Sequence, residues 1–304
     1  MLHIAKLGYV ALTTPHVEDM WTYYTEVIGF SLAEREDDGT SYLRHTTDHH
    51  TIAIYPAAEA SLRHIGFQIG QGQTLKEVAS QLFAQGVQVE MRADVQPGVP
   101  ELLQFADPEG NSIHLYSSIE QSRRGLLDRG IAPEKLGHVA FHVRNIQPMV
   151  DFYQRILGFA VSDWIEQRSV FLRCGPDHHT IQLIQQDADM PGTRGMHHIA
   201  FQLHDWTHIQ RACDHLAKKN IALSWGPGRH GPGHSLFMFH RDPDGNLIEL
   251  FSDMDLVLNE DLGYFEPRPW HTDCPQRPKV WSRSLQAANI WGIAPPETFF
   301  SSSG

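Results

Sequence analysis

The chain has 304 residues, of which 41% are hydrophobic and 20% charged, and its formal net charge is -12. This length suits two domains of roughly 130 residues plus a tail, while the acidic balance argues against binding to nucleic acid or to an anionic membrane surface. The sequence shows no signal peptide or bilayer-spanning apolar run, and its isolated cysteines (Cys174, Cys213 and Cys274) form no disulfide framework, so we expect a cytoplasmic protein.

The first half of the chain is repeated in the second half. The matching segments are 7–30 with 136–159, 48–52 with 177–181, 63–69 with 197–203 and 107–118 with 242–253. The pentapeptide DHHTI is identical in both copies, 129 positions apart. We therefore predict a tandem duplication of a unit of about 125 residues, with domains at 1–125 and 131–254 and a tail at 255–304.

Each half has the order strand, helix, strands, and this order occurs twice. In the second half, 138–143 alternates apolar and polar residues and predicts a strand, while 149–159 has helical spacing and a helix stop at Gly158. Strands are predicted at 169–174 and 179–184 around a Gly-Pro-Asp turn. The cycle restarts with a strand at 197–203, a helix at 206–220, a strand at 234–240, the turn DPDGN and a strand at 247–251. This order predicts an α+β fold.

The repeat stops at about Asp255. The tail that follows is rich in proline and arginine and contains tryptophans, but it is not of low complexity. We expect an ordered segment that packs over a domain, with a frayed end at 301–304.

Two histidines and a glutamate occupy comparable positions on three predicted strands of the second half. His138, His198 and Glu249 each lie on the strand face opposite to apolar neighbours, which must pack against helices. The three side chains should therefore point together into the concave side of the sheet. Two imidazoles and a carboxylate form the ligand set of non-haem Fe(II) oxygenases. The matching residues of the first half are Tyr9, His64 and His114. Because that set lacks a carboxylate, only the second half is predicted to bind a metal.

Several longer motifs support a resemblance to a known family. They are LGHVAFHV, FLRCGPDHHTIQL, HHIAFQL and GPGRHGPGHSLFMFHRDPDGNLIELFS. Together they resemble the motifs of type I extradiol catechol dioxygenases of the vicinal oxygen chelate superfamily, over residues 1–255. The resemblance implies two tandem domains, each of two βαβββ modules that form an open barrel-like sheet with helices outside, and a tail that acts as a lid. It also implies a non-catalytic first domain, a homo-oligomer and a bound Fe(II), with Mn(II) as the alternative.

The resemblance also implies roles for individual residues. The metal ligands would be His138, His198 and Glu249. The acid-base residue would be His179, which would take a proton from the substrate and return it. His230 would hydrogen-bond the substrate and stabilise charge. The implied reaction inserts O₂ beside the vicinal hydroxyls of a catechol-type aromatic and gives a hydroxymuconic semialdehyde-type product.

One position departs from the family pattern. Phe239 stands where the family usually has a tyrosine that hydrogen-bonds the substrate. We expect Phe239 to be a wall of the pocket, and His142 to be a candidate for lining the site. His240 could supply the missing donor only if a bulge turned it toward the Phe239 face. Otherwise the donor is dispensable, or it comes from His142 or from a tail residue such as Tyr264 or His271.

The repeated DHHTI segment needs a separate interpretation for each copy. His50 has the same repeat position as His179 but lies in the half without a carboxylate. We therefore expect His50 to be structural and His179 to be both structural and catalytic. His178 is expected on the opposite strand face, in a structural role.

Two other functions stay open. One is a metal-dependent non-oxygenase of the same superfamily, such as an isomerase, a thiol transferase or an epoxide-opening enzyme. The other is a metal-free binding or sequestering protein. The spacing of His179 and His230 argues against the first, and the intact His138, His198 and Glu249 set argues against the second.

Overall fold

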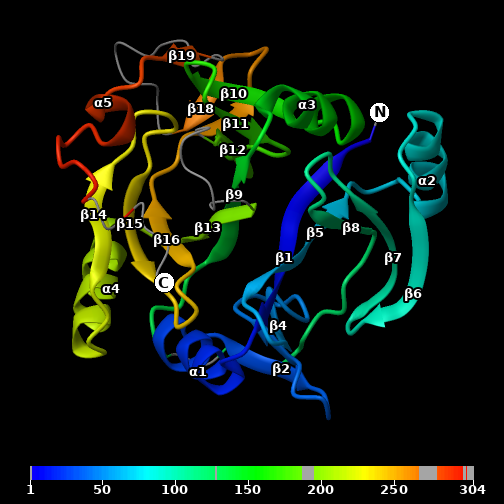
Figure 1. The fold of residues 1–304 in the computed structure, drawn as a ribbon, viewed down its shortest axis with the longest axis horizontal. Coiled ribbons are helices and arrows are strands. Elements are labelled where there is room, and N and C mark those ends of the chain that lie inside the picture. The colour runs from blue at the N-terminus through cyan, green and yellow to red at the C-terminus, as the bar shows by residue number, and fades with distance from the viewer. Residues whose placement is uncertain (1, 127–128, 187–194, 267–278, 297–298, 300–304) are drawn as a thin grey trace. The chain divides into compact units, whose positions relative to one another are not determined.

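A computed structural model of the chain describes residues 2–126, 129–186, 195–266, 279–296 and 299. The chain divides into two compact units: Met1–Leu136 with Asp151–Gly158, and Gly137–Val150 with Phe159–Gly304. Each unit contains one large sheet that is strongly curled into an open half-barrel, with few helices (Figure 1). The predicted fold class is therefore confirmed, while the exact domain boundaries stay predictions.

The sheet of the first unit has eight strands in the order β2-β3-β4-β1-β5-β8-β7-β6. Their bounds are β1 (Ile4–Thr14), β2 (Ser31–Arg35), β3 (Ser41–Arg44), β4 (Ile52–Pro56), β5 (Ser61–Ile69), β6 (Glu90–Gln96), β7 (Val99–Ala106) and β8 (Ser112–Tyr116). The helices are α1 (Val17–Thr22), the π-helix η1 (Tyr23–Ile28) and α2 (Leu75–Ala84). Strand β1 runs parallel to β4 and antiparallel to β5, and β5 runs parallel to β8. Two βαβββ modules thus meet at β1 and β5.

The second unit repeats this order and adds one strand. Its sheet runs β14-β15-β16-β13-β9-β12-β11-β10-β19. The bounds are β9 (Lys135–Val143), β10 (Ala160–Ile165), β11 (Ser169–Arg173), β12 (Ile181–Gln185), β13 (Gly195–Gln202), β14 (Leu223–Arg229), β15 (Leu236–Arg241), β16 (Leu247–Ser252) and β19 (Lys279–Trp281). The helices in this half of the chain are α3 (Ile146–Asp151), the π-helix η2 (Phe152–Ile156), α4 (Trp206–Lys218) and α5 (Leu285–Ala288). Of these, η2 lies in the segment Asp151–Gly158, which is grouped with the first unit. None of the helices in the described part of the chain is long and apolar enough to cross a membrane.

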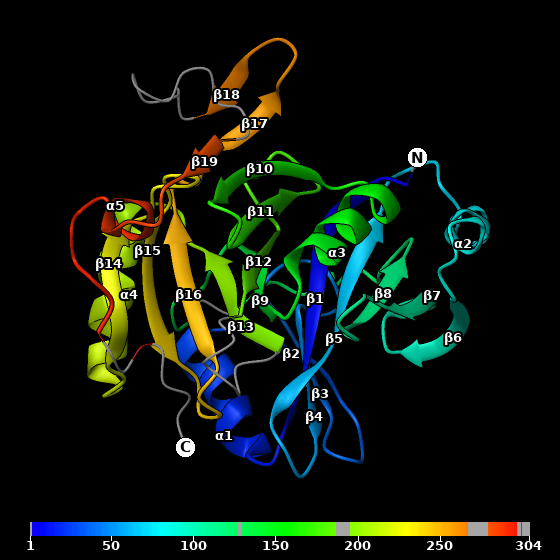
Figure 2. The same cartoon turned by 45° about the horizontal axis from the view of Figure 1, so that its top comes forward.

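The described part of the tail forms regular structure. Strands β17 (Leu256–Asn259) and β18 (Tyr264–Glu266) form a hairpin, and β19 pairs in parallel with β10 (Figure 2). The tail candidate His271 and the end 301–304 lie outside the described residues. The tail therefore extends the main sheet at the edge formed by β10.

Local signals in the sequence agree with the structure at most of these elements. Gly158 has φ +76° and follows η2, and Gly245 has φ +82° in the turn between β15 and β16, as a helix stop and a tight hairpin require. Strand β12 differs, because it begins at Ile181 rather than at the predicted His179. His178 and His179 consequently lie in the loop before the strand, so the prediction that His178 occupies a strand face was wrong.

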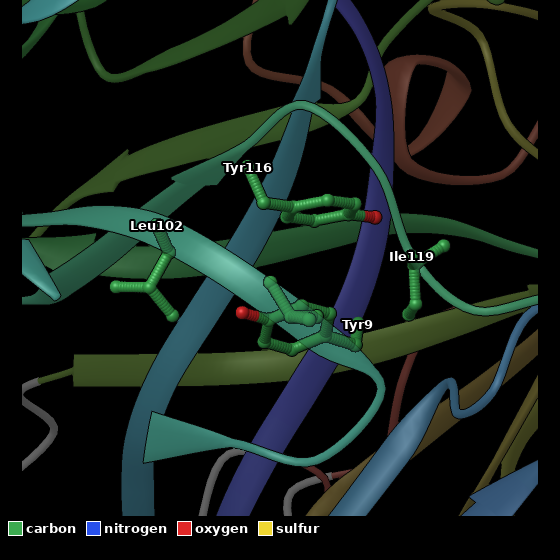
Figure 3. Close-up of a cluster of buried hydrophobic side chains, with 5 residues drawn as sticks. Tyr9, Leu102, Tyr116 and Ile119 are labelled. Carbon is green, nitrogen blue, oxygen red and sulfur yellow. The ribbon is translucent and has the colours of Figure 1, made fainter. Parts of the chain in front are cut away.

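The first unit has a tyrosine where the second unit has its first metal-ligand candidate. Tyr9 is fully buried, and its ring stacks on Tyr116 at 5.4 Å between centroids (Figure 3). A Cβ atom at Gly66 would lie 2.3 Å from the Tyr9 ring, so the ring can occupy this place only because residue 66 is glycine. The matching residue of the second unit is Ala200.

Candidate metal centre

Three neighbouring strands bring His138, His198 and Glu249 together. They come from β9, β13 and β16, which are adjacent in the sheet. Nε2 of His138 lies 3.1 Å from Nε2 of His198 and 3.0 Å from Oε2 of Glu249, and the third side of this triangle measures 3.2 Å. Alternation along the three strands therefore places all three side chains on one face, as their sequence positions predict.

This triangle fits a divalent metal ion. Metal bonds of about 2.1 Å at right angles place neighbouring ligand atoms about 3.0 Å apart, close to the separations seen here. The three residues are 1%, 3% and 2% exposed, so the carboxylate lies in a site from which water is largely excluded. A buried carboxylate is costly unless a cation compensates it. Among the described residues, this is the cluster of histidine and carboxylate groups able to hold a metal ion.

The electrostatics of the cluster favour the ligating forms of its members. Burial alone would raise the pKa of the Glu249 carboxyl, but His138, His198 and His230 outweigh it through charge and hydrogen bonds and hold the pKa well below its ordinary value. Burial lowers the pKa of His198 to about 4, against the opposing effect of Glu249. A charged carboxylate and a neutral imidazole are the forms that bind metals.

His179 lies next to the triangle. Its ring centroid is 4.1 Å from that of His138 and 5.0 Å from that of Phe171. Burial, followed by the nearby His138 and His178, holds the pKa of His179 well below its ordinary value. His179 is therefore a neutral imidazole near pH 7, with one nitrogen able to accept a proton.

His230 lies next to the second carboxylate oxygen of Glu249, the one that is not a corner of the triangle. Its Nε2 lies 3.5 Å from Oε1 of Glu249, and its Nδ1 lies 2.7 Å from the carbonyl oxygen of Ala288. Because a carbonyl only accepts, Nδ1 carries the proton of this hydrogen bond. The ring also stacks on Phe237 at 3.8 Å. The tail residue Ala288 thus fixes both the orientation and the tautomer of His230.

The predicted substrate residues divide into two groups. Phe239 pairs with Glu249 across β15 and β16, and its ring lies 5.4 Å from that of His198. His240 pairs with Ile248 in the same regular register, without a bulge. It therefore lies on the face of the sheet opposite to that of Phe239, because strand alternation continues through this position.

His142 contacts another histidine that adjoins the cluster. Its ring lies 4.7 Å from that of His197, whose Nδ1 is 2.7 Å from Nδ1 of His198. Burial holds the pKa of His197 well below its ordinary value, so this side chain is also neutral. His197 was not selected from the sequence, although its position directly before a ligand candidate offered a signal. It orients His198, as the hydrogen-bonded neighbours of metal ligands commonly do.

An aromatic wall adjoins the triangle. Trp225 stacks parallel to Phe239 at 5.9 Å, and Phe299 of the tail lies 5.2 Å from both rings. Trp225 and Phe299 were not selected from the sequence. Periodicity marks Trp225 as a core residue, and no pattern relates Phe299 to a strand about 60 positions earlier. The wall makes the side of the site next to Phe239 apolar.

The matching cluster of the first unit lacks a charged ligand. The hydroxyl of Tyr9 lies 3.0 Å from Nδ1 of His114, and the rings of His64 and His114 stack at 3.9 Å. Burial lowers the pKa of His64 to about 2 and that of His114 to about 4, so both are neutral. A neutral set without a carboxylate leaves the charge of a metal ion uncompensated.

Known proteins resemble this chain over most of its length. A sequence model described as the Glyoxalase/Bleomycin resistance protein/Dioxygenase superfamily matches residues 6–115 and 135–250. The manganese-dependent 2,3-dihydroxybiphenyl 1,2-dioxygenase of Geobacillus genomosp. 3 is 28% identical over 300 residues, covering 91% of this chain and 93% of the relative. The iron-dependent extradiol dioxygenase of Rhodococcus jostii is 23% identical over 270 residues, with 82% and 89% covered. The Mn(II)-bound glyoxalase of Novosphingobium aromaticivorans superposes with a TM-score of 0.85 at 22% identity, covering 100% of this chain and 96% of that one.

Proposed function

Because the chain belongs to the glyoxalase/bleomycin resistance protein/dioxygenase superfamily, we propose that it is an extradiol dioxygenase that cleaves a catechol-type ring beside its two hydroxyl groups. The observation that carries this proposal is the buried triangle of His138, His198 and Glu249, with His179 and His230 next to it. A divalent metal held by these three residues would be able to bind both hydroxyls of a catechol and O₂.

The residues around the triangle have the properties that this reaction needs. A divalent metal held by the triangle would lower the pKa of a substrate hydroxyl and bring the catechol and O₂ together. His179 is neutral and adjacent to His138, so it accepts the proton of a substrate hydroxyl and later gives it back to the reacting substrate. Because Nδ1 of His230 donates to Ala288, Nε2 of the neutral ring is an acceptor, and it presents this lone pair toward the same space to receive a hydrogen bond from a substrate hydroxyl. The aromatic wall excludes water from the apolar side of the ring.

The metal is proposed to be Fe(II), with Mn(II) as the alternative. Two imidazoles and a carboxylate suit both ions, and one relative is named manganese-dependent while another is named iron-dependent. A homo-oligomeric state and a cytoplasmic location stay predictions.

The direct test loads the metal-free protein anaerobically with Fe(II) or Mn(II) and then adds air and a panel of catechols. We expect yellow ring-cleavage products with at least one catechol, O₂ uptake equal to the catechol consumed, and loss of both after chelation. The matched sample is the metal-free protein with the same substrates. If neither ion supports cleavage of any catechol, the proposed function is wrong.

Replacing Phe239 by tyrosine should increase the activity. The para position would gain a hydroxyl on the residue that pairs with Glu249, next to the expected substrate. One hydrogen bond contributes about 0.5–1.5 kcal/mol, so kcat/KM should rise about twofold to tenfold in Phe239→Tyr. Steady-state kinetics with the preferred catechol measures this change. An unchanged kcat/KM would mean that another group already supplies the hydrogen bond.

A further inference from the structure

A chain of buried side chains connects a carboxylate to His179. Nε2 of His178 lies 3.2 Å from Oδ2 of Asp163, and Nδ1 of His178 lies 3.1 Å from Nδ1 of His179. Because a carboxylate only accepts, Nε2 of His178 carries the proton of the first contact. In a neutral His178, Nδ1 is then an acceptor, and the proton of the second contact belongs to Nδ1 of His179. Nε2, on the other side of the His179 ring, therefore carries the lone pair.

The tail holds the carboxylate at the start of this chain. Strand β19 pairs with β10 so that Lys279 lies opposite Asp163. The backbone N–H of Lys279 donates to Oδ1 of Asp163 at 3.1 Å, and Nε1–H of Trp281 donates to Oδ2 at 2.9 Å. Asp163 therefore receives three N–H donors, and its side chain is only 4% exposed. Such a carboxylate is fixed in place and acts solely as an acceptor.

The tail also holds the loop that carries the two histidines. The backbone N–H of His178 donates to the carbonyl oxygen of Asp255 at 2.8 Å, and that of Val257 donates to the carbonyl oxygen of Pro176 at 2.6 Å. These backbone contacts have counterparts in the first unit, where the N–H of His49 donates to the carbonyl oxygen of Glu120 and the N–H of Ser122 donates to that of Thr47. The contacts of β19 with Asp163 are therefore the part of this arrangement that has no counterpart among the described residues of the first unit.

The first unit provides an internal comparison. Glu34, His49 and His50 have the same repeat positions, with His49 Nε2 3.2 Å from Glu34 Oε2 and its Nδ1 3.1 Å from His50 Nδ1. Here the carboxylate is 47% exposed, and within the described residues β2 is an edge strand with no counterpart of β19. Nε2 of His50 forms a hydrogen bond with the side-chain amide nitrogen of Gln96 at 3.0 Å. The same arrangement of a carboxylate and two histidines is therefore partly exposed in the first unit, whereas in the second unit β19 covers and hydrogen-bonds its carboxylate.

We propose that Asp163, His178 and strand β19 form a positioning relay that keeps the proton of His179 on Nδ1 and presents its Nε2 to the catechol. Asp163, His178 and Trp281 are positioning residues, because they act through His179. The catalytic part of this inference rests on the proposed function, while the position of the proton does not.

The first experiment replaces the carboxylate by an amide. Lys279 donates to Oδ1 of Asp163, while His178 and Trp281 share Oδ2, so in Asp163→Asn the NH₂ group must face either Lys279 or the other two donors. When it faces His178, Nε2 of that ring has to accept and the order of donors along the relay reverses. We expect Asp163→Asn to lower kcat about 10- to 100-fold, the usual effect of losing an outer-shell partner, with KM and metal content unchanged. The matched control Glu34→Gln should keep the wild-type kcat. Equal kcat in Asp163→Asn and wild type would overturn the relay.

A second pair of variants covers the case in which Asp163→Asn does not fold. His178→Phe keeps a ring in the loop but removes both nitrogens, and His49→Phe makes the same change in the first unit. The relay requires a lower kcat with retained metal in His178→Phe alone. Equal kcat values in the two variants would contradict it.

A readout independent of activity is the tautomer of His179. Long-range ¹H–¹⁵N spectra of the full-length, metal-free chain with ¹⁵N-labelled histidine should show the proton on Nδ1, and a shift of the proton toward Nε2 in Asp163→Asn. A wild-type proton on Nε2 would overturn the relay whatever the enzyme cleaves. If the tautomer is as expected but no catechol is cleaved, the proposed function fails and the relay stands as a structural feature.

Discussion

Replacing His198 by alanine is expected to abolish stable metal binding. Its Nε2 is one corner of a triangle in which the other corners lie 3.1 Å and 3.2 Å away. Loss of a partner that only supports a ligand costs about 10- to 100-fold in metal affinity, so loss of the ligand itself should cost on the order of 100-fold or more. Metal content after reconstitution and dialysis, measured by mass spectrometry, checks this result.

The duplication offers a control for the same substitution. His64 has the repeat position of His198 and is similarly buried, but its cluster with Tyr9 and His114 contains no carboxylate. His64→Ala should therefore keep the full metal content, although it removes the same atoms from the same kind of sheet. Full metal retention in His198→Ala, or an equal loss in both variants, would remove His198 from the ligand set.

Replacing His179 by glutamine is expected to slow turnover without releasing the metal. Glutamine can still hydrogen-bond to His178, but it cannot take up a proton. General acid-base catalysis contributes about 10²- to 10⁴-fold, so kcat should fall within that range. Anaerobic catechol titration and metal analysis should give wild-type values, because the residue lies beside the triangle and is not one of its corners.

His50→Gln is the matched change in the first unit. Its side chain bonds to Gln96 and lies 4.6 Å from the Tyr9 ring. No loss of turnover is expected, since the surrounding residues offer no carboxylate ligand. Normal turnover in His179→Gln would exclude proton transfer by His179, and an equal loss in both variants would mean that both histidines are structural.

The fold and the core of the site are readable from the sequence because both depend on short-range periodicity. Alternation places His138, His198 and Glu249 on the same strand faces, and the repeat reveals that only one unit has the carboxylate. The same alternation explains why His240 points away, since β15 stays in regular register. The π-helical turns are different, because the bond from Gly29 N–H to the Tyr24 carbonyl spans five residues and leaves no distinct pattern.

The rest of the site depends on contacts between distant parts of the chain. Strand β19 has three residues and pairs with β10, more than a hundred positions earlier, so no local signal predicts that it covers Asp163. Phe299 and Ala288 reach the site in the same way. A weak signal for the relay did exist, because Glu34 and Asp163 place a carboxylate at the same repeat position.

The close fit of Tyr9 over Gly66 bears on how the two units could evolve further. Replacing Tyr9 by histidine would leave part of the space of a fully buried ring empty, and such cavities are destabilising. Introducing alanine at position 66 first would bring its Cβ to 2.3 Å from that ring. A carboxylate would also have to replace His114, which the hydroxyl of Tyr9 now engages. Each of these substitutions alone is destabilising without the others, so the mutual fit of Tyr9, Gly66 and His114 makes a second metal centre in the first unit difficult to reach by single substitutions.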